Sequence, residues 1–369
     1  MNEDNKKQSL IRISKRGAIP MWKSLGIRLI GLLIALIICA LIIFGITKLN
    51  PLKVYGSMWN GAFGTNKRVW VTIRDTMMML CIGLGLAPAF KMRFWNIGAE
   101  GQVLVGGIAA AACMLYLPQT MPNWLALVIM FIASAIAGAI WGFFPGLFKA
   151  LSNTNETLFT LMMNYIAIRL TAFFVAKWEN PYGSNTVGII NSRSKFGWFP
   201  SIAGQQYLLN VLLVAVLTIF IYVYLKYTKH GFEIAVVGDS ENTARYCAMD
   251  VKKIIIRTML LSGALCGVAG FLAVAGAGHT ISTDTAGGRG FITIIVAWMS
   301  KFNSFVMAIV SLLLVFLEKG AMQIASQYQL SDYVSNIVKG IILIFLLGSE
   351  FFVNFKVNFR GSHNKEVAK

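Results

Sequence analysis

Long uncharged apolar runs alternate with short polar segments along nearly all of this chain of 369 residues. A helix that crosses a bilayer needs about 20 consecutive, mostly apolar residues. One run, 291–300, has about half that length, so it predicts a half-helix. We therefore predict an all-α polytopic membrane protein with about ten transmembrane helices, over residues 29–47, 69–90, 103–117, 124–147, 158–175, 207–225, 259–277, 291–300, 303–322 and 334–347.

The composition agrees with this class of protein. Hydrophobic residues make up 57% of the chain and charged residues 13%, whereas soluble proteins have about 25% charged residues. A net charge of +18 would indicate nucleic-acid binding in a soluble protein. Here, however, Lys and Arg flank the apolar runs, where they orient the helices and bind anionic lipid. We therefore expect contact with membrane lipid and none with nucleic acid.

One polar segment, residues 226–258, separates two apolar runs and is rich in Lys and Arg. Basic residues favour the cytoplasmic side of a membrane, so we predict a cytoplasmic loop. Within it, 240–249 is predicted to be a short helix, with Ser240 as its N-cap and Glu241 in its first turn. A structured loop on this side indicates a surface for a soluble partner.

Both ends of the chain are predicted to be cytoplasmic. The first apolar run follows basic residues, is too long for a signal peptide and lacks an A-x-A site after it, which indicates a retained signal anchor. Ten crossings return the C-terminus to the same side. The basic first outer loop, with Lys48, Lys53, Lys67 and Arg68, runs against this orientation. The predicted parts are a tail over 1–28, a transmembrane domain over 29–350 with a cytoplasmic loop at 226–258 and an outer loop at 177–206, and a tail over 351–369.

Two glycine-rich segments resemble each other: GAEG at 98–101 and GGRG at 287–290. Each follows a Gly-rich apolar run and precedes a short one, and an odd number of predicted crossings separates them. This spacing predicts an inverted repeat of spans two to five and seven to ten, as in many transporters. The alternative is a chance likeness, because glycine is common in membrane helices.

The usual catalytic and cofactor motifs are absent from the sequence. There is no G-x-x-x-x-G-K-[ST] to hold ATP phosphates, no H-E-x-x-H and no G-x-S-x-G. The three histidines are scattered, and no two of the five cysteines have C-x-x-C spacing. We therefore expect no enzyme activity, no catalytic residue, no metal and no cofactor in this chain.

Glu100 is the first candidate for contact with a solute. It lies among glycines between two apolar runs, with Asn96 and Gln102 nearby. A carboxylate and two amides beside the membrane can bind a hydroxylated ligand, and acids there are functional more often than surface ones. The alternative is a structural acid at a helix terminus, or a partner of Arg93.

Asn155, Glu156 and Asn164 form the second candidate group, at the start of and within the apolar run 158–175. An Asn inside a membrane helix needs a partner, which is either a solute or a neighbouring helix, and helix contact is the leading alternative for Asn164. For Glu156, the alternative is an acid in a first helical turn with Thr154 as the N-cap. Gly263 and Gly267, in contrast, predict a close helix–helix contact without chemistry.

Three segments resemble a known family: FWNIGAEGQVLVGGIAA, TNETLFTLMMNYIAI and GFEIAVVGDSENTARYCAMDVKKIIIRTMLLSGALCGVAG. They are similar, in order, to permease subunits of bacterial ABC importers for simple sugars and nucleosides. NIGAEGQ resembles the nucleoside branch, and the D-L-S-x-G pattern of ribose-type permeases is not found at that place.

The resemblance implies a vitamin-B12-importer-like (type II) fold in the bacterial cytoplasmic membrane. It also implies a second permease, a cytoplasmic ATPase subunit that binds ATP and Mg, and an extracytoplasmic binding lipoprotein. The outer loop, with Trp178, Tyr182, Phe196 and Trp198, would face that lipoprotein. The segment 238–250 would couple to the ATPase, although its Ile234-Ala235 and Thr243–Ala248 depart from the family pattern. The implied coupling residues are Gly238, Asp239, Glu241, Asn242, Arg245 and Tyr246.

The expected function is nucleoside import by alternating access. The main alternative within the class is a ribose- or galactose-type permease. From other classes, an ion-coupled secondary carrier would also have inverted repeats and buried acids, and a membrane-embedded enzyme would require a nucleophile–base pair that cannot be named here.

Overall fold

The computed structural model describes residues 11–16, 20–47, 50–329 and 332–359. The chain forms two compact units, which we call unit 1 (Met1–Gly64 and Leu317–Lys369) and unit 2 (Thr65–Phe316). The predicted division into two tails and one transmembrane domain stays a prediction. Its terminal parts at 1–10, 17–19 and 360–369 lie outside the described residues.

Unit 1 is built from the two ends of the chain. Helix α1 packs along α13, and Arg28 of α1 forms an ion pair of 2.8 Å with Glu350 of α13. Beyond these helices, β1 and β2 pair in antiparallel register, with Ile13 opposite Val357. The all-α prediction missed both strands, although FKVNF alternates apolar and polar residues as a strand does. The elements are β1 (Ile11–Lys15), α1 (Met21–Thr47), α2 (Pro51–Phe63), the end of α12, α13 (Asp332–Asn354) and β2 (Phe355–Phe359).

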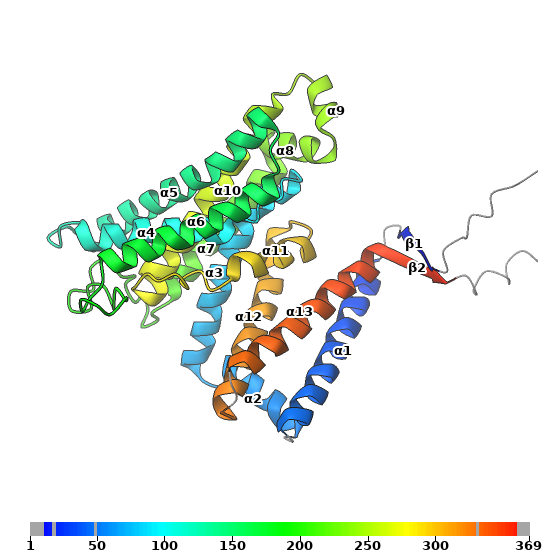
Figure 1. Cartoon of the computed structure of the whole chain (residues 1–369), viewed down its shortest axis with the longest axis horizontal. Helices are drawn as coiled ribbons and strands as arrows, with labels where there is room; N and C mark the ends of the chain where they lie inside the picture. The colour runs from blue at the N-terminus through cyan, green and yellow to red at the C-terminus, as the bar shows by residue number, and fades with distance from the viewer. Residues whose placement is uncertain (1–10, 17–19, 48–49, 330–331, 360–369) are drawn as a thin grey trace, which may run out of the picture. The chain divides into compact units, whose positions relative to one another are not determined.

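Unit 2 is a bundle of helices with α10 buried along most of its length (Figure 1). Helix α10 packs against α3, α4 and α5. Its last turn becomes a π-helix, η1 (Val274–Gly278). The other elements are α3 (Asn66–Lys91), α4 (Ala99–Tyr116), α5 (Asn123–Ser152), α6 (Glu156–Lys177), α7 (Leu208–Tyr227), α8 (Lys229–Asp239), α9 (Glu241–Tyr246), α10 (Val251–Ala273), α11 (Arg289–Met299) and the start of α12 (Ser304–Gln327).

The helices confirm a polytopic helical membrane protein. Among the described residues, 7 helices are long and apolar enough to cross a membrane, and shorter apolar helices cover Gly26–Ile42, Arg289–Met299 and Gly340–Val353. These regions coincide with the ten predicted ones. Helix α10 begins at Val251, well before the predicted residue 259, because Asp250 caps it and it runs through the basic residues first. The type II arrangement, the inverted repeat and ten full crossings stay predictions.

Glycines let α10 touch its neighbours backbone to backbone. A Cβ atom added to Gly263 would collide with the carbonyl oxygen of Gly138 on α5, and one added to Gly267 with that of Ser134. On α4, a Cβ at Gly106 would collide with the Gly267 carbonyl. The predicted close contact at Gly263 and Gly267 is therefore confirmed, and it needs small residues on all three helices.

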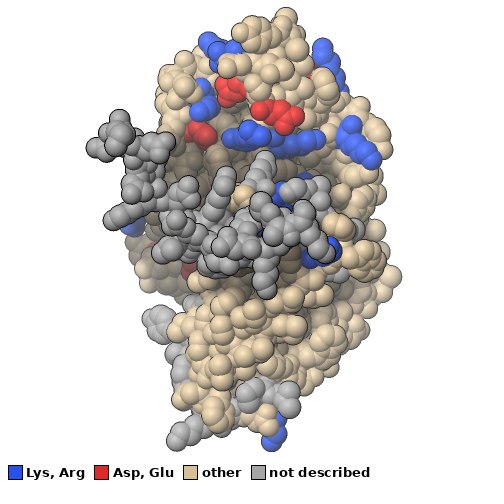
Figure 2. Space-filling view, turned by 90° about the vertical axis from the view of Figure 1, so that its right-hand side faces the viewer, with Lys and Arg blue, Asp and Glu red and all other residues tan. Residues whose placement is uncertain are grey.

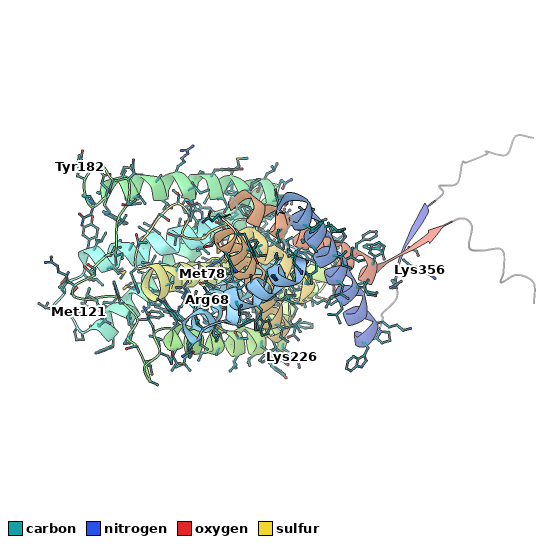
Figure 3. All side chains as sticks on the ribbon, turned by 90° about the horizontal axis from the view of Figure 1, so that it is seen from below. Arg68, Met78, Met121, Tyr182, Lys226 and Lys356 are labelled. Atoms are coloured by element: carbon teal, nitrogen blue, oxygen red, sulfur yellow. The ribbon has the colours of Figure 1, made fainter. Side chains whose placement is uncertain are left out.

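Unit 2 has two distinct ends. In Figure 1, α8 and α9 lie at one end of the bundle, and the loop between α6 and α7 lies at the opposite end. Figure 3 shows Met121 and Tyr182 at this loop end and Lys226 toward the other, with Met78 between them. The two predicted surfaces for partners thus lie at opposite ends of one bundle.

Candidate functional site

The two glycine-rich segments found in the sequence meet inside unit 2. Glu100, in the first turn of α4, is only 6% exposed. Its Oε1 accepts a hydrogen bond of 2.8 Å from the backbone N–H of Gly288, and its Oε2 accepts one of 2.8 Å from Gly290. Helix α11 begins between these two glycines, so Glu100 caps the N-terminus of a helix distant in sequence. An acid is stabilised there by free N–H groups and the helix dipole.

Two glycines of the second segment, Gly288 and Gly290, are required for different reasons. A Cβ atom at Gly290 would lie 2.5 Å from the backbone nitrogen of Glu100 and 2.8 Å from its Cα. At Gly288 nothing lies within 4 Å, but the backbone has φ of +72°, which favours glycine. Gly290 therefore allows the close approach of α4 and α11, whereas Gly288 allows the turn before α11.

An ion network centred on the buried carboxylate of Asp75 extends from α11 to α3. Nη2 of Arg289 lies 3.2 Å from Oδ2 of Asp75. The other oxygen of Asp75 lies 2.8 Å from Nη2 of Arg74, and Nη1 of Arg74 donates to the Tyr207 hydroxyl at 3.3 Å. The Asp75 side chain is only 3% exposed. Buried charges need such partners, and loss of one partner is costly.

The predicted residues Asn96 and Gln102 are hydrogen-bonded to each other, and Asn96 is also bonded to α10. Nδ2 of Asn96 donates to Oγ of Ser262 at 3.0 Å and to Oε1 of Gln102 at 3.3 Å. Oδ1 of Asn96 accepts the N–H of Gly98 at 3.0 Å. Both amide side chains are buried. In this conformation they fix the start of α4 to α10.

Asn164 performs a similar role from α6. Its Oδ1 accepts the N–H of Gly101 at 2.8 Å, and its Nδ2 donates to the carbonyl oxygen of Ile97 at 2.9 Å. Both bonds join α6 to the start of α4, which is the helix contact considered as the alternative for Asn164. A role in contact with solute stays a prediction for this residue.

Asn155 and Glu156 lie at the start of α6, outside these bonds. Asn155 is the N-cap of α6, and its Oδ1 accepts the N–H of Leu158 at 3.1 Å. The proposed N-cap Thr154 is therefore wrong by one residue. Glu156 forms an ion pair of 2.9 Å with Lys149, at the end of α5. Of the six predicted solute residues, the structure thus brings Asn96, Glu100, Gln102 and Asn164 together.

The predicted coupling residues lie mainly on the exposed surface of α9. Ser240 is the N-cap of this helix, as predicted, and accepts the N–H of Thr243 at 3.2 Å. Tyr246 is 92% exposed. Asp239 and Asn242 are also exposed, and Arg245 lies 3.7 Å from Glu241. Figure 2 views the molecule from the side on which α9 lies in Figure 1, and basic and acidic side chains lie close together in the upper part of that view.

Gly238 differs from the other coupling residues because it is buried. A Cβ atom there would collide with the carbonyl oxygen of Lys91, the last residue of α3. Nζ of Lys91 also donates to the carbonyl oxygen of Leu225 on α7 at 3.0 Å. The end of α8 is thus in direct contact with α3, just before the chain turns toward Glu100.

Sequence reasoning missed the charged partners in the centre. Arg74 and Asp75 lie inside the predicted span 69–90, and Arg289 lies in the second glycine-rich segment, but no pairing among them was predicted. A signal was present, because charged residues within apolar runs usually face the protein interior and one another. Which charge pairs with which was not readable from the sequence.

Comparison with known proteins gives consistent matches. The family described as "Branched-chain amino acid transport system / permease component" matches residues 71–347. The chain is 32% identical to the guanosine ABC transporter permease protein NupP of Bacillus subtilis, over 87% of this chain and 92% of the relative. It is 29% identical to the nucleoside ABC transporter permease protein NupB of Lactococcus lactis, over 60% and 63%. It is 24% identical to the glucose ABC transporter permease protein TsgB13 of Haloferax volcanii, over 94% and 93%.

Proposed function

Since the chain belongs to the branched-chain amino acid transport system permease family, and is thus the non-catalytic membrane subunit of an ABC importer, we propose that it carries nucleosides. The observation that carries this proposal is the match to a guanosine permease over 92% of that protein's length. NIGAEGQ, the segment that resembles the nucleoside branch, contains Asn96, Glu100 and Gln102. These are three of the four predicted solute residues that lie together around the start of α4. A sugar is the second candidate, because a glucose permease matches over 94% of this chain.

The driving force would come from a separate ATPase subunit that binds ATP and Mg. Helix α9 offers an exposed tyrosine and a charged pair to such a subunit. The contact of Gly238 with Lys91 gives a direct route by which a displacement of α8 can move the end of α3. A binding lipoprotein would dock at the opposite end, on the loop between α6 and α7, and a second permease would complete the translocation unit.

The proposal also includes the type of membrane and the side of it on which each part of the chain lies. The chain would lie in the bacterial cytoplasmic membrane with α9 and both termini in the cytoplasm. The basic segment 226–258 supports this orientation through the positive-inside rule.

Alternating access would act on the buried polar network, by which we mean the hydrogen bonds and ion pairs that join the starts of α4 and α11 to α3, α6 and α10. It lies between the two ends of unit 2, so tilting α3 and α4 against α10 and α11 must rearrange its hydrogen bonds. We expect the polar groups of Asn96, Glu100, Gln102 and Asn164 to exchange these bonds for hydroxyl and base groups of the solute during transport. Asn155 and Glu156 would lie at the cytoplasmic exit.

Transport in reconstituted vesicles tests the proposal. The permease pair, the ATPase and the binding lipoprotein are reconstituted together, and uptake of labelled guanosine and uridine is measured with and without ATP. We expect ATP-dependent uptake that unlabelled nucleosides inhibit and free ribose or glucose does not. Inhibition by the sugar alone would support the second candidate. Uptake that needs no ATPase and collapses with an ionophore would indicate a secondary carrier.

The coupling surface is tested by charge reversal. Arg245→Glu on α9 and Lys252→Glu at the start of α10 are expected to raise the number of ATP molecules hydrolysed per nucleoside transported, because the ATPase would bind this surface less tightly. Lys67→Glu, with the same change of charge at the exposed start of α3, is the control for this ratio. An unchanged ratio in the first two variants would place the ATPase contact elsewhere.

A further inference from the structure

A cavity lies at the end of unit 2 opposite α9. It has a volume of about 710 Å³ and is formed by the loop between α6 and α7 together with the turn before α5. This volume is within the range of small-molecule sites in proteins. Its lining combines aromatic, amide and hydroxyl side chains, among them Gln119, Asn123, Trp198, Phe199, Ser201 and Gln206.

Trp198, one of the lining residues, is held in place by contacts of its ring and its backbone. Its ring stacks on the imidazole of His279, with centroids 3.7 Å apart and planes 4° apart. Its Nε1 donates to the carbonyl oxygen of Ile190 at 2.9 Å, and its own carbonyl oxygen accepts from Nδ2 of Asn123 at 2.9 Å. His279 covers one face of the indole, and Trp198 is among the residues that line the cavity. An aromatic ring fixed in this way can stack on a planar ligand at little entropic cost.

His279 contributes its ring face rather than its nitrogens. The residue is only 8% exposed, yet neither ring nitrogen makes a hydrogen bond with any described residue. Buried imidazoles normally satisfy these atoms, and leaving them unpaired costs stability. The backbone carbonyl of His279 accepts the N–H of Ile190 at 2.8 Å, which fixes the loop to the end of α10. Such a local cost is typical of functional positions.

The cavity lining is also joined to the segment that follows α10, which lies near the ion network. Phe199, which lines it, donates its N–H to Ala275 in the π-helix at 3.1 Å. His279 follows this π-helix and lies within electrostatic reach of Arg74, a member of the ion network. Through Trp198 and Phe199, the cavity lining is thus connected to the segment that follows α10.

We propose that this cavity is an entry subsite for the base of the transported nucleoside, with the base stacked on Trp198. The amides of Gln119 and Gln206 and the hydroxyl of Ser201 would hydrogen-bond to the base edge and the sugar. This inference rests on the proposed function, and it adds a recognition element within the permease itself.

Binding to the permease alone tests the subsite. The whole chain is placed in lipid nanodiscs without its partners, and equilibrium binding of labelled guanosine, uridine and ribose is measured. Trp198→Ala should weaken nucleoside binding by about 5- to 150-fold, the range for loss of one stacked base. Trp198→Phe should retain most of the affinity, and His279→Gln should weaken it less than Trp198→Ala. Ribose should bind poorly throughout.

The control is Trp124→Ala, which removes a tryptophan that is 67% exposed, one residue after Asn123 and outside the cavity lining. It should bind nucleosides as the unmodified chain does. Thermal unfolding of each variant in the nanodisc identifies any loss of fold, and Trp198→Phe provides the second test if Trp198→Ala does not fold.

Three binding results would overturn the subsite, and two uptake results would as well. One is nucleoside affinity that Trp198→Ala leaves unchanged, and another is equal affinity for ribose. The third is a permease that binds the lipoprotein more weakly after Trp198→Ala while its own nucleoside affinity stays the same, which would make the cavity a protein-docking site. Nucleoside uptake by the complete transporter with an unchanged KM in Trp198→Ala would also reject the subsite while leaving the proposed function intact. Uptake of sugar alone would reject both.

Discussion

The starts of α4 and α11 are built from similar glycine-rich segments that differ in charge. In the first segment the third residue is Glu100, and in the second it is Arg289. Glu100 reaches the N–H groups at the start of α11. Arg289 reaches in the other direction, to Asp75 on α3. Two acids at this point would repel each other, so the opposite charges allow the two helix starts to lie together.

The comparison also shows that the two helix starts are stabilised differently. Helix α11 receives a carboxylate at its N-terminus, where the helix dipole favours negative charge. Helix α4 receives the neutral amide of Asn164 instead. A cation at the start of α11 is unfavourable beside the dipole, and Asp75 offsets this for Arg289. The charged interactions are thus concentrated on α11, the half-helix, which has few turns of its own to stabilise it.

Breaking the ion pair between Arg289 of the second segment and Asp75 should have the largest effect. Asp75→Asn removes a buried carboxylate and leaves two partly buried guanidinium groups without it, and is expected to lower stability by about 3–5 kcal/mol. The double variant Asp75→Asn/Arg289→Gln should recover part of this loss, because it removes one orphaned charge. Thermal unfolding in detergent measures both. A double variant no more stable than Asp75→Asn alone would contradict the pairing.

Filling the contact between the two segments should have the next largest effect. Gly290→Ala places a methyl group against the backbone of Glu100, which cannot move aside as a side chain can, so a loss of about 3 kcal/mol is expected. Gly288→Ala meets open space and should cost only about 1–2 kcal/mol, for the strained φ. The same unfolding measurement compares them. Equal losses would mean that the close approach is not required.

Removing the charge on the acidic side should have a smaller effect. Glu100→Gln keeps one acceptor but presents an NH₂ group to a backbone N–H, with an expected loss of about 2 kcal/mol. Glu156→Gln is the matched control, because the pair of Glu156 with Lys149 is nearer the surface and should contribute about 1 kcal/mol or less. If Glu100 also contacts solute, Glu100→Gln should lower uptake beyond what its stability explains. Uptake that follows stability in both variants would leave Glu100 a purely structural residue.

The loops before α11 and before α4 should contribute differently to the pH dependence of stability. The loop before α11 contains His279, and the loop before α4 contains no histidine. Burial, followed by the charge of Arg74, lowers the pKa of His279 below its ordinary value of 6.5. The unfolded chain therefore binds a proton before the folded chain does, so stability should be full above about pH 6.5 and fall as the pH drops below it. His279→Gln should flatten this dependence in unfolding measured from pH 8 to 5, and an unchanged slope would assign it to other groups.

Local signals in the sequence were sufficient for much of the fold. The apolar runs located the helices of unit 2, because bilayer thickness sets their length. Ser240 marked the start of α9, since an N-cap depends only on residues within one turn. Gly263 and Gly267 marked a close contact because only small residues allow backbones to touch. The short strands β1 and β2 and helix α2 were missed, since each is short and lies outside the long apolar runs.

By itself, the sequence determined a helical membrane protein, its family resemblance and the importance of the segment around Glu100. Only the tertiary structure decided that Glu100 caps α11, that Asp75 pairs with Arg289 and that Trp198 stacks on His279. Each of these contacts joins residues far apart in the chain, and its existence depends on how whole helices pack. Hydrophobicity and capping act within a few residues, whereas the partner of a buried charge is fixed only when the bundle has assembled.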